Sequence, residues 1–525
     1  MDAIFWIRSK LSAFFSNIIP AVKPFIYLYE DYLSFILGWD PKWLNEAALQ
    51  TGCLYKDCST LTPTPIKERY LSFSEYQQAT VPWLLEETWE NVQASLISNL
   101  RRFRALSELN NCPLFQYLLD PKLTGGMFRS TKTKFQVFCE YLQTKLFGKK
   151  NYTTRDGNTV HNESQQLVIE EAVSMVCDGN KNEPKVYMIQ GPPGTDGLKV
   201  RRVGCDEALC MEEDVNRVKL EYLTEQQLVN NIRSYPNEQN VKKQVFEEAD
   251  VIISTLNYTG NRLFDPYCPI ADRQKFPWFD CLIVDEAAQC IEIDTFIPLR
   301  LGVKKIILVG DPEQLPATVI SNQALNAHLN QSLFERLFNL FKQQEKLNPI
   351  QMLNIQYRMN EEICRFPSEH IYQGRLLTDK QTNIERSKFH LIPYAFINVL
   401  NSCEQLDPVI QSYYNTIEAQ VVVDLIRYLT TIENIPLSTI GIITPYRKQL
   451  QLIQRQLSTK IDVSTVDGFQ GREKDIILLS SVRAQQQEED NRGSIGFVGN
   501  KQRLNVSLTR GKYAVYIIGH LQSLN

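Results

Sequence analysis

Acidic side chains follow two short apolar runs near the middle of the chain. Asp285 and Glu286 come directly after Leu282–Val284, and Asp311 comes shortly after Ile306–Val309. An apolar run without polar alternation, bounded by polar turns, is typical of a central strand in a parallel sheet. Because open α/β sheets bind ligands at the carboxyl ends of their strands, these carboxylates are candidate ligand groups. Of the adjacent pair, one can hold a magnesium ion while the other acts on an attacking water.

Gln314 follows the second of these runs, where its amide can sense a terminal phosphate. Either half alone would also suit a strand that ends in solvated acids. Both halves occur in this order, CLIVDEAAQC before KKIILVGDPEQLP, and motif matches gain force from such context. The stretch therefore favours a phosphate-handling site.

A turn rich in glycine and proline follows an apolar run further upstream, in VYMIQGPPGT. Backbone N–H groups of such a turn cradle phosphates, as in a P-loop. The candidate phosphate-binding residues are Gly191, Pro192, Pro193, Gly194 and Thr195. The full pattern G-x-x-x-x-G-K-[ST] requires Gly, Lys and Ser or Thr next, but the chain has Asp196, Gly197 and Leu198.

Each of these departures weakens phosphate binding. Without lysine at position 197 no ammonium neutralises the β- and γ-phosphates, and without a hydroxyl at 198 magnesium loses a ligand. Asp196 places a carboxylate where an anion should meet helix-terminal N–H groups. The following LKVRRVG alternates like a strand and does not open a helix. We interpret the Thr195–Asp196 junction as a seam, left by a spliced variant or faulty gene model, or else carried by an evolved pseudo-enzyme.

Three further motifs follow GDPEQLP at 310–316: QYRM at 356–359, VDGFQGREKD at 466–475 and RLNVSLTR at 503–510. In this order and spacing they resemble the motifs of superfamily 1 helicases, in the branch that includes senataxin and the nonsense-decay helicase. Within that branch, the segments FSEY…ETWE and FRALSEL and the ending GFVGNKQRLNVSLTR favour the senataxin type. The resemblance covers residues from about 60 to 525.

The resemblance implies an α/β fold with two RecA-like parallel-sheet domains and a mainly helical N-terminal region. We predict that residues 1–150 form the helical region, 151–348 the first RecA-like domain and 349–525 the second. The family has a β-barrel at this point, but the segment between Glu90 and Phe103 is too short to form one, so we interpret the barrel as missing. The first domain is expected to be truncated after Thr195.

The resemblance also implies a role for individual side chains. Asp285 would hold magnesium, Glu286 would activate water, and the remaining catalytic residues would be Gln314, Arg358 and Arg510. Gln165 would read the adenine edge, Tyr357 would stack on the base, Gly471 would permit close approach, and Glu473 would bind ribose or hold an arginine. The expected nucleic-acid contacts are Thr255, Pro316, Thr318, Thr465 and Val466.

Local patterns predict the elements that position these residues. Asn162 or Ser164 can cap a helix that runs to Val176. Val251–Gly260 reads as a strand ending near Thr255, and Leu325–Phe341 reads as one helix closing the first domain.

Bulk composition limits the ways in which the chain can bind nucleic acid. The 56 Lys and Arg against 60 Asp and Glu leave a net charge of -4, so contacts must come from a local groove, hydrogen bonds or stacking. The 12 cysteines include no CxxC pair, and free thiols at this density indicate a reducing, intracellular compartment. No apolar run near the N-terminus reaches the ~18 residues of a membrane span. Nuclear residence is implied by the resemblance alone.

Three functions remain open. The first is an ATP- and Mg²⁺-dependent helicase that translocates on single-stranded RNA or DNA, with RNA–DNA hybrids as further partners. The second is a non-hydrolysing scaffold, derived from such a helicase, that binds nucleic acid or protein. The third is an unproductive fragment that folds poorly because its first sheet lacks a strand. The missing lysine argues against the first for this chain, whereas intact Asp285, Glu286, Arg358 and Arg510 argue against a long-standing loss of catalysis.

Overall fold

The computed structural model describes most of the chain from the middle onward. The described ranges are residues 163–177, 185–194, 237–249, 252–268, 278–342, 350–457, 461–484 and 499–524, with scattered positions in 67–118 and 220–228. Most of the predicted N-terminal helical region, the residues of the Thr195–Asp196 junction and the loop at 485–498 therefore lie outside the described part.

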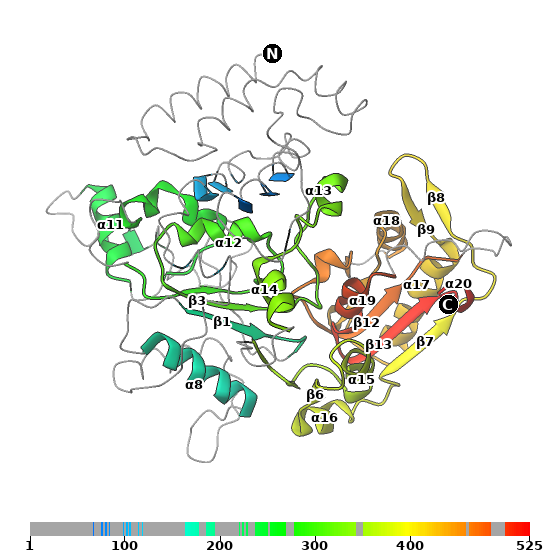
Figure 1. Cartoon of the computed structure of the whole chain (residues 1–525). Coiled ribbons are helices and arrows are strands. Elements are labelled where there is room, and N and C mark those ends of the chain that lie inside the picture. The colour runs from blue at the N-terminus through cyan, green and yellow to red at the C-terminus, as the bar shows by residue number, and fades with distance from the viewer. Residues whose placement is uncertain are drawn as a thin grey trace.

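A four-stranded parallel sheet forms the first half, in the order β2-β3-β1-β4. Its strands are β1 (Lys185–Gln190), β2 (Leu282–Val284), β3 (Lys305–Gly310) and β4 (Ile350–Met352). Helix α8 (Glu163–Cys177) packs on one face, and α12 (Glu292–Leu299) and α14 (Leu333–Lys342) pack on the other (Figure 1). The fully apolar β3 is buried along its length because both faces are covered.

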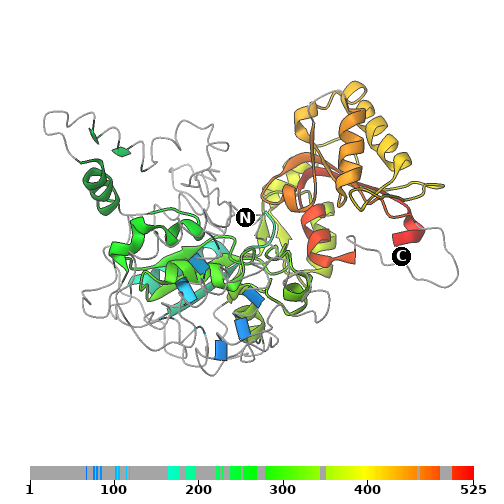
Figure 2. The same cartoon turned by 90° about the horizontal axis from the view of Figure 1, so that it is seen from above.

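A five-stranded parallel sheet forms the second half, in the order β11-β10-β12-β13-β7. Its strands are β7 (Tyr394–Asn398), β10 (Ile440–Ile443), β11 (Asp462–Ser464), β12 (Lys474–Ser480) and β13 (Gly511–Gly519). Helices α17 (Thr416–Thr431) and α18 (Arg447–Gln456) cover one face. Helices α15 (Glu361–His370) and α19 (Lys501–Leu508) cover the other. The two sheets lie in separate halves of the molecule (Figure 2).

Shorter elements connect these layers. They are α11 (Glu238–Glu247), η5 (Asn257–Gly260), η6 (Arg262–Tyr267), α13 (Asn322–Asn326), β5 (Ile355–Gln356), β6 (Leu377–Thr378), α16 (Lys380–Arg386), β8 (Gln405–Asp407), β9 (Ser412–Tyr414), η7 (Leu437–Thr439), η8 (Asp467–Phe469) and α20 (Leu521–Leu524). Among the described residues, no helix is both long and apolar enough to cross a membrane.

The predicted α/β class with two parallel sheets is confirmed, but two local predictions are wrong. Residues 252–255 form no strand; the Thr255 hydroxyl accepts the Tyr258 N–H at 3.3 Å and so begins the 3-10 turn η5. The helix expected over Leu325–Phe341 is two helices, because His328 adopts a φ of 66° after α13. Ser332 then begins α14 by accepting the Glu335 N–H at 3.0 Å.

Candidate functional site

The turn after β2 carries the two adjacent carboxylates, and both are exposed. The Ala287 N–H donates to the Val309 carbonyl at 2.8 Å, which fixes this turn against the end of β3. Asp285 accepts the Glu286 N–H at 3.0 Å, and Glu286 has a φ of 52°. The carboxylates therefore leave the sheet at the carboxyl ends of its strands, as the sequence predicts.

The glycine- and proline-rich turn lies between the two halves of the molecule. Its Gly191 N–H donates to the Gly310 carbonyl at 3.1 Å, and its Gly194 carbonyl accepts the Tyr357 N–H at 2.8 Å. Gly194 has a φ of +79°, and a Cβ there would lie 2.8 Å from the Cβ of Arg358. Pro192 and Pro193 are buried between these contacts, whereas Thr195 is outside the described residues.

Arg358 is held by an acidic partner that directly precedes β12 of the second sheet. Its Nε lies 2.8 Å from Glu473, and Lys512 lies 3.0 Å from the other carboxylate oxygen of Glu473. Burial alone would raise the pKa of Glu473, but Arg358 and Lys512 outweigh it and lower this pKa to about 2. The sequence left two roles open for Glu473, binding ribose or holding an arginine. In the structure Glu473 pairs with Arg358.

Arg510 and Gln314 meet across the two halves. The Arg510 side chain donates to Gln314 Oε1 at 3.4 Å and to the Val506 carbonyl at 3.0 Å, and its residue is only 2% exposed. Gln314 Nε2 in turn donates to Asp311 at 3.1 Å. A guanidinium from the turn between α19 and β13 of the second half thus reaches the loop that follows β3.

Of the other nucleotide candidates, Gln165 lies in α8 and Gly471 lies in the turn between η8 and β12. Gln165 is buried in the first turn of α8, and Gly471 has a φ of +72° with open space where a Cβ would point. Both settings are compatible with a close backbone or base contact, and the roles of Gln165 and Gly471 stay predictions.

The nucleic-acid candidates differ in exposure. Thr255 and Thr318 are exposed, Pro316 and Thr465 are half-buried, and Val466 is only 1% exposed within the core of the second half. Val466 can therefore present only its backbone to a strand.

Comparisons with known proteins agree with this geometry. Two family models, each described as an AAA domain, match residues 211–322 and 329–522. The yeast Saccharomyces cerevisiae protein "Helicase SEN1" is 32% identical over 402 residues, which are 73% of this chain and 17% of that protein. The human protein "Probable helicase senataxin" is 36% identical over 329 residues, 60% of this chain and 12% of that protein. The chain belongs to the senataxin-like superfamily 1 helicases.

The likeness to these senataxin-like helicases is partial in length. The chain spans about a sixth of the yeast relative and about an eighth of the human one. A solved structure, "The structure of PRRSV helicase", aligns over 65% of this chain and 53% of its own with a TM-score of 0.27 and 14% identity, too weak a likeness to support an argument.

The sequence assigns one carboxylate, Asp285, to magnesium. Among the described residues, no group of three or more His, Cys, Asp or Glu side chains could hold a metal. Magnesium bound mainly through substrate phosphates and one or two carboxylates needs no such group, so Asp285 fits this ion. At such a site the ion would neutralise phosphate charge.

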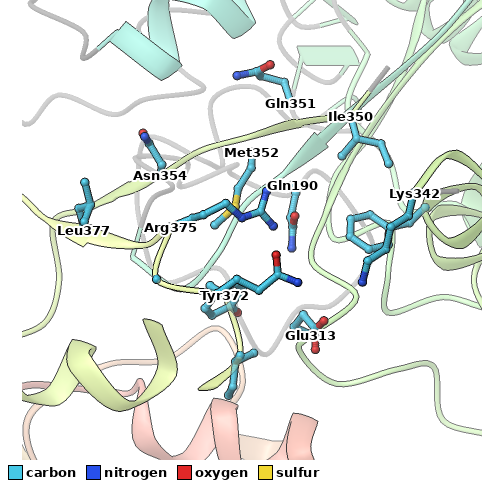
Figure 3. Close-up of a pocket in the computed structure, with 14 residues that line it drawn as sticks. Gln190, Glu313, Lys342, Ile350, Gln351, Met352, Asn354, Tyr372, Arg375 and Leu377 are labelled. Carbon is cyan, nitrogen blue, oxygen red and sulfur yellow. The ribbon is translucent and has the colours of Figure 1, made fainter. Parts of the chain in front are cut away.

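The sequence marked Asp311 as a candidate ligand group at a strand end, but it did not indicate that this carboxylate is buried among hydrogen-bond donors. Asp311 is 3% exposed, and burial raises its pKa to about 6, although hydrogen bonds from Tyr372, Gln314 and Gln190 lower it. A cavity of about 580 Å³ opens beside it, and Figure 3 shows Gln190, Tyr372 and Arg375 on its wall. GDPEQLP pointed to Asp311, but its partner lies 61 residues away and carries no local signal.

Gly310 allows the end of β3 to approach the turn that carries the helicase carboxylates. A Cβ at Gly310 would lie 2.8 Å from the Ala288 nitrogen and 3.1 Å from the Ala287 nitrogen, both backbone atoms. We expect Gly310→Ala to lower the free energy of unfolding by roughly 1–3 kcal/mol, measured by urea denaturation, because the turn must move. Gly374→Ala is the control, since its Cβ would meet nothing within 4 Å and only the φ of +73° opposes it. A Gly310→Ala variant no less stable than Gly374→Ala would contradict this packing.

Proposed function

We propose that this chain is the motor portion of an ATP-dependent, nucleic-acid-translocating helicase, with ATP hydrolysis impaired in the chain as it stands. The observation that carries the proposal is that loops from the two halves of the molecule contact each other at this site. The Arg510 guanidinium of the second half donates to Gln314 of the first half, and the backbone and Cβ of Arg358 lie against the Gly194 turn. The Arg358 guanidinium itself is held by Glu473 within the second half. Fixed guanidinium groups at such a boundary stabilise the charge of a transferring phosphoryl group.

The chain's own residues divide the work of this reaction. Asp285 would hold Mg²⁺, which neutralises phosphate charge when bound, and Glu286 would accept a proton from the attacking water. Gln314 and Arg510, already in contact, would face the terminal phosphate. Glu473 stays ionised at neutral pH and so keeps Arg358 oriented.

Impairment follows from the incomplete phosphate loop. No lysine or hydroxyl stands at positions 197 and 198, and the first family match begins at residue 211, beyond this junction. The contact between Gly194 and Tyr357 also brings the two halves together where phosphates would need room. This contact favours the second candidate, a scaffold that binds nucleic acid without turnover.

The proposed substrates are single-stranded RNA or DNA, with RNA–DNA hybrids as the narrower possibility, and the proposed location is the nucleus. Support comes from the relatives named as helicases and from the exposed Thr255 and Thr318. The chain's net charge of -4 restricts this contact to a local surface.

A binding assay tests the proposal. We expect a fluorescently labelled single-stranded RNA to bind with an affinity that falls linearly, on logarithmic axes, with salt concentration. We also expect the non-hydrolysable analogue Mg-AMP-PNP to alter this affinity, and Arg510→Ala to abolish that effect. Arg365→Ala, which removes an exposed arginine paired only locally with Glu362, should leave it intact.

Three results are distinguishable. RNA binding that ignores Mg-AMP-PNP supports the scaffold over the motor. Binding that responds to the analogue equally in Arg510→Ala removes Arg510 from the site. If the chain shows no salt-dependent binding of RNA or of DNA, the proposed function is wrong.

A further inference from the structure

Asp311 is the centre of a buried polar cluster where the two halves meet. Its carboxylate accepts hydrogen bonds from Tyr372 Oη at 2.6 Å, Gln314 Nε2 at 3.1 Å, the Glu313 N–H at 3.2 Å and Gln190 Nε2 at 3.3 Å. Three of these donors belong to the first half, and Tyr372 belongs to the second. A buried carboxylate with four donors is held in one orientation, because losing any donor leaves charge unsatisfied at low dielectric.

Helix α19 of the second half forms hydrogen bonds with the loop that contains Asp311. Asn505, which is fully buried, donates through Nδ2 to Tyr372 Oη at 2.8 Å and to the Glu313 carbonyl at 2.9 Å. Gln502 donates to the Pro312 carbonyl at 2.8 Å. The loop from Asp311 to Gln314 is therefore fixed through both its side chains and its backbone.

Gln314 has little freedom left within this arrangement. Its Nε2 donates to Asp311 at 3.1 Å, so its Oε1 points away and accepts from Arg510 at 3.4 Å. Without the bond to Asp311, the amide could turn and present Nε2 to the Arg510 guanidinium, which has no acceptor for it.

We propose that Tyr372 and Asn505 are positioning residues that act from the second domain on the Asp311 loop and so set the orientation of Gln314 toward Arg510. The inference rests on the proposed function, in which Gln314 faces the terminal phosphate. Figure 3 shows Tyr372, Gln190 and Glu313 together on the wall of the cavity that lies beside the loop.

Passive packing is the competing account of Tyr372. Its ring is 1% exposed in an apolar cluster with Ile371 and Leu376, and packing alone would bury it there. Tyr372→Phe separates the two accounts because it keeps the ring and removes only the hydroxyl that touches Asp311 and Asn505. Tyr428→Phe is the matched control, since it removes an exposed hydroxyl bonded to Glu433.

The first measurement is backbone hydrogen exchange of the whole chain, which needs no nucleotide. In Tyr372→Phe we expect faster exchange at the amides of Glu313 and Gln314, by roughly 2- to 10-fold, the effect of one lost hydrogen bond. Exchange within β13 and β7 should not change, and Tyr428→Phe should match the unmodified chain throughout. Unchanged exchange at 313–314, or an increase spread over β13 and β7, would overturn the inference.

The second measurement is the ratio of the affinities for Mg-AMP-PNP and Mg-ADP, which reports recognition of the terminal phosphate. We expect Tyr372→Phe to lower this ratio, and to have no further effect when Gln314→Ala is already present. Two outcomes would show a purely structural role for Tyr372 and overturn the inference. One is faster exchange at 313–314 with an unchanged ratio of the two nucleotide affinities. The other is a double variant, Tyr372→Phe with Gln314→Ala, in which the two effects on this ratio add. If the unmodified chain binds neither nucleotide, the proposed function fails, while exchange at 313–314 still decides whether Tyr372 holds the loop.

Discussion

Replacing Arg336 with methionine is expected to lower the free energy of unfolding by about 3–5 kcal/mol. The Arg336 side chain is fully buried, and its guanidinium donates to both carboxylate oxygens of Glu292 at 2.6–3.1 Å. It also donates to the Leu118 carbonyl at 3.0 Å, joining a described position of the N-terminal region to α12 and α14. Without Arg336 the Glu292 carboxylate remains buried and unpaired, so the cost far exceeds that of an exposed ion pair.

Urea denaturation of three variants tests this expectation. Arg336→Met combined with Glu292→Leu should recover most of the loss, because replacing both partners of a buried pair by apolar groups is often neutral. Arg365→Met, which removes an exposed arginine paired with Glu362, should stay within about 0.5 kcal/mol of the unmodified chain. An Arg336→Met loss no larger than that of Arg365→Met would refute a structural role for this pair.

The second large effect is a fall in stability as the pH rises from about 4 to 7. Burial raises the pKa of Glu418 to about 7, despite hydrogen bonds from the Val482 N–H and Ser480, and it raises the pKa of Asp311 to about 6. Between these values and the ordinary carboxyl pKa, the folded chain binds more protons than the unfolded chain, so raising the pH favours unfolding. Each group contributes on the order of 3 kcal/mol.

Urea denaturation at several pH values, in the unmodified chain and in Glu418→Gln, tests the direction of this change in stability and the residues that cause it. Between pH 5 and 7 the free energy of unfolding of the variant should fall by only about half as much as that of the unmodified chain. Asp311 accounts for the fall that remains. Glu433→Gln is the control: hydrogen bonds from Tyr428 and His390 lower the pKa of this half-buried group, so it titrates below that window. Glu473 acts in the opposite direction, because its stabilisation is lost as the pH falls from about 4.5 toward 2. Stability that rises from pH 5 to 7 would contradict the burial of Asp311 and Glu418.

The sequence predicted those parts of the fold that have a local signal. Leu282–Val284 and Ile306–Val309 are strands because unbroken apolar runs suit a sheet covered on both faces. The placing of Asp285 and Glu286 at the end of a strand follows from the same pattern. Family motifs added Arg358 and Arg510, and the structure brings these two to the Gly194 turn and Gln314.

The remaining errors have physical causes that a local pattern does not carry. The helix expected over Leu325–Phe341 breaks where His328 takes a left-handed conformation, which periodicity cannot indicate. Val466 stays a predicted neighbour of the nucleic-acid backbone, but the sequence did not indicate that its side chain is buried in the core of the second half. The Tyr372–Asp311 bond joins residues that are 61 positions apart and lie in different halves of the molecule, so only the folded chain shows it.

ATP turnover by the purified chain tests the central claim, that a helicase cleft has assembled its catalytic groups around an incomplete phosphate loop. Release of phosphate would be followed with and without single-stranded RNA, beside a Glu286→Gln variant that lacks the proposed proton acceptor. We expect both proteins to show the same low rate, unchanged by RNA, because no lysine or hydroxyl stands at 197 or 198. RNA-stimulated turnover that disappears in Glu286→Gln would contradict the account and show a working motor.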